Sequence, residues 1–67
     1  MKLIEAQQLI KGDTVRITVG ASTMFPDLPE HSEILTVKHW ETCYVGEVAV
    51  MVAEYPSLIS CRYLTRS

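Results

Sequence analysis

The chain has 67 residues, of which 48% are hydrophobic and 21% charged, and six basic and eight acidic residues give a formal net charge of −2. This composition is typical of one globular domain and excludes a disordered chain, while every uncharged apolar run is too short to cross a bilayer. The charges are scattered along the chain, which indicates a solvated surface rather than a dedicated basic or acidic segment.

The N-terminal segment and the two cysteines predict a cytoplasmic protein. Glu5 and the glutamines that follow it interrupt what would have to be the hydrophobic part of a secretory signal. Cys43 and Cys61 lie far apart and belong to no CxxC pair, so we expect two reduced thiols with structural roles. Residues 1–67 are expected to form one small domain of low net stability, because so short a chain can build only one core.

The first part of the chain predicts a helical turn followed by a strand. Apolar residues recur at three- and four-residue spacing within Leu3–Ile10, which predicts a short helix that Gly12 would end. Residues Asp13–Val19 alternate strictly between polar and apolar side chains and form the clearest strand of the sequence. Its apolar face continues to Val19, so we expect Val19 to point inward.

Residues 20–33 contain a glycine, two prolines and several polar turn formers, so we expect one long loop there. After it, Ile34–Trp40 predicts a strand with His39 on the inward side, and Tyr44–Ala53 predicts the most buried strand. A turn at residues 55–57 leads to a last strand, Leu58–Leu64. Together, the alternating positions predict a core of Val15, Ile17, Val37, Val48, Val50 and Ile59.

These elements predict an all-β fold, a small barrel of four to five strands with a short N-terminal helical turn and one long loop, because a flat sheet would leave one face uncovered. The segment GDTVRITV, followed by a long loop and a meander, resembles the SH3-like small barrels of bacterial type over roughly three quarters of the chain. The resemblance implies the fold and no particular ligand, since the ALYDY-type aromatic segment of eukaryotic peptide-binding domains is absent.

The long loop contains the main candidate binding site. Met24, Phe25 and Leu28 are apolar residues set among prolines and acids, at a place in the fold that should be polar. They either fold down as a lid over an open barrel end or form a patch that binds a partner and has an acidic rim. Trp40 is added because aromatic side chains are enriched at interface centres. The candidate partner-binding residues are Met24, Phe25, Asp27, Leu28, Glu30 and Trp40.

Catalysis and metal binding are not expected. The sequence shows no phosphate-binding glycine loop and no spacing typical of a nucleophile with its base, and a small barrel leaves little room for a substrate cavity. His31, His39, Cys43 and Cys61 do not follow the spacing of a zinc finger or ribbon. We therefore expect no enzyme activity, no cofactor and no metal ion.

The leading hypothesis is a small adapter, accessory subunit or phage-type inhibitor. It would bind another protein, or a second copy of itself in a homodimer, through the long loop and one face of the sheet, with no membrane partner. The alternative is a nucleic-acid-associated barrel that uses Arg16, Lys38 and Arg62, all at predicted outward positions. The negative net charge opposes this alternative, because nucleic-acid binding needs several phosphate contacts.

Overall fold

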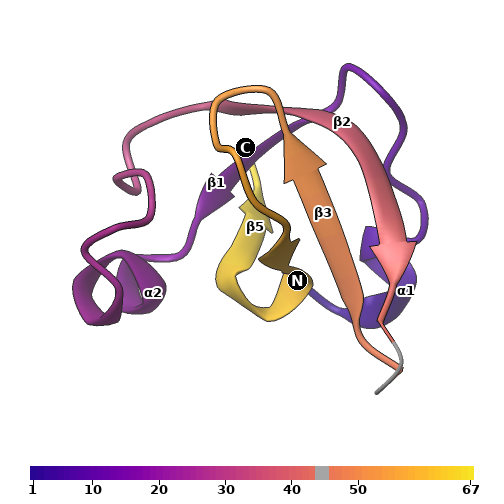
Figure 1. Cartoon of the computed structure of the whole chain (residues 1–67), viewed down its shortest axis with the longest axis horizontal. Coiled ribbons are helices and arrows are strands. Elements are labelled where there is room, and N and C mark those ends of the chain that lie inside the picture. The colour runs from indigo at the N-terminus through magenta and orange to yellow at the C-terminus, as the bar shows by residue number, and fades with distance from the viewer. Residues whose placement is uncertain (44–45) are drawn as a thin grey trace.

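A computed structural model describes residues 1–43 and 46–67 (Figure 1). Along the chain the elements are α1 (Leu3–Ala6), β1 (Thr14–Ile17), α2 (Val19–Met24), β2 (Leu35–Thr42), β3 (Val48–Val52), β4 (Ile59–Ser60), the 3₁₀ turn η1 (Cys61–Tyr63) and β5 (Leu64–Arg66). The strands form one antiparallel sheet in the order β4-β3-β2-β1-β5. The predicted small all-β fold with an N-terminal helical turn is therefore confirmed. Of the helices in the described ranges, none has the length and apolar character needed to span a membrane.

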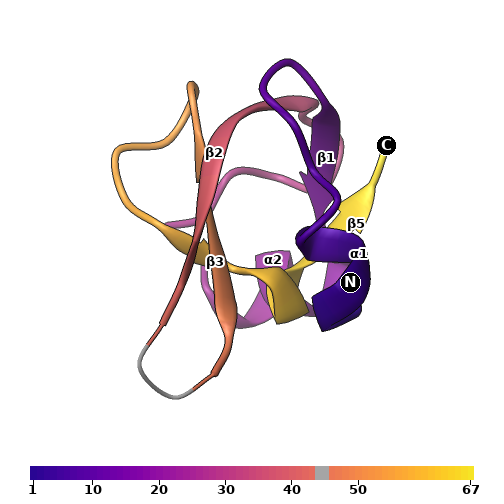
Figure 2. The ribbon, with the colours of Figure 1, turned by 90° about the vertical axis from the view of Figure 1, so that its right-hand side faces the viewer.

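Strand β2 joins the two halves of the sheet. Its first residues pair with β1, at Val15↔Leu35, whereas its later residues pair with β3. A β-bulge between Val37 and His39 interrupts the second pairing, and bulges bend a strand and increase its twist. Figure 2 shows β2 curving from the side of β1 to the side of β3.

The bulge also corrects the predicted inward position of His39. The strict alternation that buries Leu35 and Val37 breaks at the extra residue, so His39 is exposed and Trp40 instead packs against the core. The strand also runs on to Thr42, two residues beyond its predicted end at Trp40. Residues 44 and 45, at the start of the predicted third strand, lie outside the described residues.

The core lies inside the curve of the sheet, where α1 contributes Ala6 to it. Every predicted core position is at most 2% exposed, which confirms the alternation used to choose them. The confirmed positions are Val15, Ile17, Val37, Val48, Val50 and Ile59. The largest further buried side chains are Leu35 and Leu64, from β2 and β5.

The expected loop over residues 20–33 is wrong in its first part, because the chain forms α2 there. The Thr18 hydroxyl caps this helix by accepting a hydrogen bond from the amide of Ala21 at 3.2 Å. Strand β1 therefore ends at Ile17, and Val19, expected to point inward, is 61% exposed in the first turn of α2. The Thr18 cap starts α2, so β1 ends at Ile17 although the alternation of polar and apolar residues continues to Val19.

The predicted last strand is also divided. It begins as β4, continues as η1 with Cys61 buried, and ends as β5, which pairs with β1 at Ile17↔Leu64. The Ser60 hydroxyl accepts a hydrogen bond from the amide of Arg62 at 3.5 Å and caps the 3₁₀ turn. The turn moves the chain from one edge strand of the sheet to the other.

Candidate functional site

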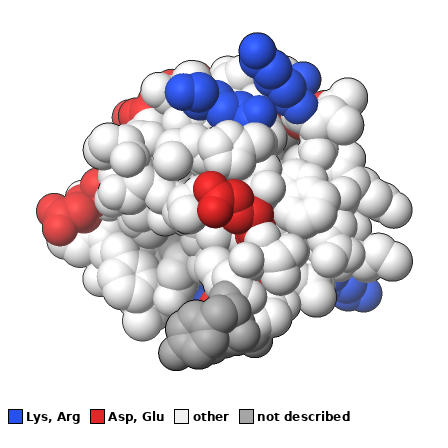
Figure 3. Space-filling model, turned by 45° about the vertical axis from the view of Figure 1, so that its right-hand side comes forward, with Lys and Arg blue, Asp and Glu red and all other residues white. Residues whose placement is uncertain are grey.

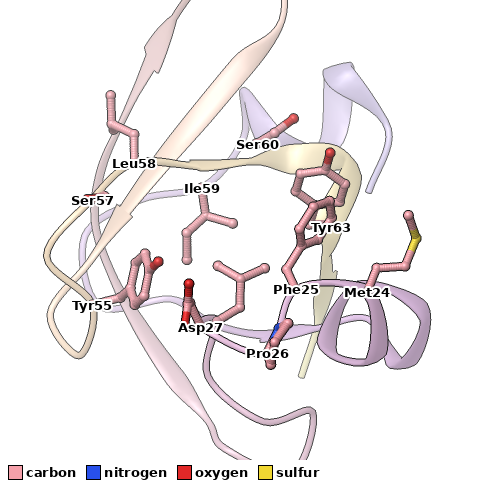
Figure 4. A pocket seen from close by; sticks show the side chains of 11 residues that line it. Met24, Phe25, Pro26, Asp27, Tyr55, Ser57, Leu58, Ile59, Ser60 and Tyr63 are labelled. Carbon is pink, nitrogen blue, oxygen red and sulfur yellow. The ribbon is translucent and has the colours of Figure 1, made fainter.

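A pocket of about 350 Å³ opens between the end of α2, the connection from β3 to β4, and η1 (Figure 4). Side chains from two separate stretches of sequence, residues 24–28 and 55–63, line it. They are Met24, Phe25, Pro26, Asp27 and Leu28 from the segment after α2, Tyr55, Ser57 and Leu58 from the β3–β4 connection, and Ile59, Ser60 and Tyr63 from β4 and η1. Of the predicted loop, only residues 24–28 contribute to the pocket, and the tertiary structure supplies the rest of the lining.

The first wall is set by the way α2 ends. The amide of Phe25 donates the last helical hydrogen bond, to the carbonyl of Ala21 at 2.9 Å, and Pro26 cannot continue the helix. A turn follows, in which the amide of Leu28 donates to the carbonyl of Phe25 at 3.0 Å, and Leu28 packs against the core. Further along, the ring Nδ1 of His31 donates to the carbonyl of Ile17 at 2.6 Å and ties the loop to β1.

The second wall is an aromatic pair. The rings of Phe25 and Tyr63 lie with their centroids 5.1 Å apart and their planes at 56°, a tilted arrangement that favours contact between ring edge and face. The amide of Thr18, which caps α2, donates to the carbonyl of Tyr63 at 2.9 Å. This bond holds α2 beside η1, so the two rings meet although they are far apart in the sequence.

The third wall is the turn after β3. The Glu54 carboxylate accepts a hydrogen bond from the amide of Thr36 at 2.8 Å, and the amide of Ala53 donates to the carbonyl of Thr36 at 3.0 Å. These two bonds fix the turn to the start of β2. Tyr55 follows directly and packs partly against the core, so its ring is held at the pocket.

The hydrogen bond from the Thr36 amide holds the pKa of Glu54 below its usual value of 4.5. The ionised Glu54 therefore stabilises the folded chain above pH 4.5, and this contribution is lost as the pH falls through the lower pKa of the folded state. Glu54→Gln should lower the urea midpoint of unfolding at neutral pH, and the difference from the wild type should shrink as the pH falls below 4.5. A difference that stays constant from neutral to acid pH would show that the carboxylate charge contributes nothing to this turn.

Most of the side chains that line the pocket are apolar, and one of the lining residues is charged. Asp27 is the single acidic residue of the lining, and no lysine or arginine is among the lining residues. In the view of Figure 4 the side chain of Asp27 lies between those of Tyr55 and Phe25, and it is exposed. At the rim, Met24, Phe25 and Leu58 are 72%, 38% and 40% exposed, so apolar surface continues from the pocket onto the outside of the molecule.

Four of the six candidate residues predicted from sequence meet in this pocket: Met24, Phe25, Asp27 and Leu28. Glu30 is exposed beyond it. Trp40 lies in β2 opposite Val50, half-buried against the core, and does not line the pocket. The contribution of residues 55–63 was not predicted, and the available signal for it was two tyrosines, one of them next to a proline.

The basic residues of the alternative hypothesis are differently placed. Arg62 forms an ion pair with Glu47, and the Nε of Arg16 is buried without a hydrogen-bond partner within the described ranges. Lys38 is exposed and lines a second cavity together with Glu54. Figure 3 shows basic side chains along the upper rim of one face and acidic side chains at its centre and left edge, so this face is mixed in charge.

The histidines and cysteines lie in separate environments. His39 contacts Glu41 at 3.1 Å on the exposed side of β2, whereas His31 is bonded to the carbonyl of Ile17. Cys61 is buried and Cys43 half-buried, and both are free thiols. Within residues 1–43 and 46–67, no three His, Cys, Asp or Glu side chains are grouped so as to hold a metal ion.

Comparisons with protein-family models, with curated proteins and with solved structures found no significant match to this chain. The interpretation of the pocket therefore rests on its own geometry and chemistry.

Proposed function

We propose that this chain is a cytoplasmic, non-catalytic protein-binding module that acts as an adapter, accessory subunit or inhibitor of a larger protein. The observation that carries the proposal is the pocket with its exposed apolar rim at Met24, Phe25 and Leu58. Apolar surface gathered around a concave site favours burial against a partner, and aromatic side chains in such sites carry much of the binding energy. The pocket supplies three of them, Phe25, Tyr55 and Tyr63.

The proposal includes a closed, SH3-like arrangement of the strands. The sheet has β4 and β5 as its two edges, and the three-residue turn η1 is all that separates them along the chain. The hydrogen bond between Thr18 and Tyr63 brings the end of β1 to the same turn. A sheet bent in this way leaves little open edge for other chains to pair with, so side chains around the pocket become the binding surface.

The side chains of the pocket favour binding over catalysis. Its hydroxyl groups belong to serines and tyrosines, and no histidine is among the lining residues to act as their base. The cavity is also open at the rim, where Asp27 is exposed. An open site with one carboxylate lacks the paired groups that acid–base chemistry needs.

The test is affinity capture from lysate of the source cells with the chain immobilised. We expect one or a few proteins to be retained in stoichiometric amount, and to remain after nuclease treatment. Retention of nucleic acid that falls steeply with salt concentration would instead favour the alternative based on Arg16, Lys38 and Arg62. Absence of any retained protein, with the captured material consisting of nucleic acid, would contradict the proposal.

A further inference from the structure

We propose that the pocket receives one lysine or arginine side chain from an extended segment of the partner protein. This inference rests on the proposed protein-binding function and adds the chemistry of the bound group. Its first support is charge complementarity, because Asp27 is the single charged residue of the pocket lining. A bound cation would pair with this carboxylate as the partner excludes water from the site.

The apolar walls match the rest of such a side chain. Lysine and arginine carry a long aliphatic stem that packs on apolar surface while the charged end reaches a polar group. Phe25 and Tyr63 form one aromatic wall and Tyr55 belongs to the other side of the pocket. Aromatic faces also attract cations, so the walls and the carboxylate favour the same ligand.

The size of the pocket agrees with one long side chain. Ligand pockets for whole small molecules span roughly 300–1,000 Å³, and this cavity, at about 350 Å³, is at the small end of that range. It is also open toward the exposed side chains of Met24 and Leu58, on which the neighbouring residues of an extended segment would rest.

Other occupants fit the chemistry less well. A purely apolar side chain would give the Asp27 carboxylate no partner, so the one charge of the lining would contribute nothing to its binding. An acidic side chain or a phosphate would be repelled by Asp27, and the same loop carries the exposed acids Glu30 and Glu33. The observations therefore favour a cation on an aliphatic stem.

The test uses randomised, displayed dodecapeptides selected on the immobilised wild-type chain. Selected peptides should be enriched in lysine or arginine next to an apolar residue. Synthetic versions should bind Asp27→Asn at least roughly tenfold more weakly than the wild type, because a hydrogen bond between charged groups is lost. Glu33→Gln is the matched control, since it removes an acid of the same loop outside the pocket, and it should leave affinity unchanged.

Replacing the basic residue of a selected peptide by glutamine should weaken binding to the wild type as much as Asp27→Asn does, and the two changes together should add little more. The inference would be overturned if the selected peptides lacked a basic residue or if no peptide were enriched. It would also be overturned if the peptides bound Asp27→Asn and the wild type with equal affinity. If binding is lost in Phe25→Ala but unchanged in Asp27→Asn, the pocket is a protein-binding site and only the basic ligand is wrong. Circular dichroism of each variant establishes that it is folded.

Discussion

Ile17→Ala is expected to unfold a large fraction of the chain, with a loss of about 2–5 kcal/mol in the free energy of unfolding. Ile17 is fully buried at the end of β1, between its ladder partner Leu64 and the remaining core. A domain of this length has a total stability of about 3–10 kcal/mol, so a cavity at this position removes much of it. Urea unfolding followed by the fluorescence of Trp40 measures the loss.

Val19→Ala is the matched control for this prediction. Val19 continues the apolar alternation of β1 in sequence, yet it is 61% exposed in α2, where alanine is an intrinsically better helix former than valine. We expect a change within about 0.5 kcal/mol. If Val19→Ala were as destabilising as Ile17→Ala, β1 would extend through Val19 and the start of α2 would be wrong.

The strands and core could be predicted because alternation is a local property of the sequence. Val15 and Ile17, or Val48 and Val50, are separated by one residue, and this spacing places both on the same face whatever the rest of the chain does. The bulge after Val37 could not be predicted in this way. It depends on how β2 pairs with two different strands, and it decides whether His39 or Trp40 packs inward.

The helix α2 was missed because its sequence resembles a loop. Gly20, Ser22 and Thr23 are weak helix formers, and Pro26 follows closely. The structure shows what compensates: Thr18 caps the N-terminus, and the hydroxyls of Ser22 and Thr23 each donate to the carbonyl of Val19 at 3.0 Å. Thr18 was the one signal in the sequence that could have indicated this helix, since threonine is a favoured N-cap residue.

Four of the eleven residues that line the candidate site could be predicted from sequence. Apolar residues beside prolines and acids marked Met24, Phe25 and Leu28 without knowledge of the fold. Tyr63 could not be added, because its place beside Phe25 depends on the 3₁₀ turn and on the hydrogen bond between Thr18 and Tyr63. Sequence spacing carries no information about a contact between residues this far apart.

Phe25→Ala is expected to weaken partner binding strongly in a chain that is still folded. Phe25 is 38% exposed and forms one wall of the pocket against Tyr63, so truncation removes an aromatic anchor and part of the cavity shape. The cost in stability should be about 1–2 kcal/mol, because the ring is only partly buried. A loss of 3 kcal/mol or more would instead show that Phe25 mainly caps the core.

Two further variants keep this test informative. Met24→Ala changes a neighbouring pocket residue that is 72% exposed, so it should weaken binding with almost no effect on folding. Ile4→Ala is the control, because Ile4 is 64% exposed in α1, which Figure 1 shows on the side of the molecule opposite α2. It should bind as the wild type does.

The most direct measurement is isothermal titration of the captured partner protein into the wild type, Phe25→Ala and Ile4→Ala, each shown to be folded by circular dichroism. A protein-binding pocket predicts that Phe25→Ala weakens the affinity by roughly thirtyfold or more, as for a central interface residue, while Ile4→Ala leaves it unchanged. Equal affinity of all three folded chains would contradict the assignment of the pocket as the binding site.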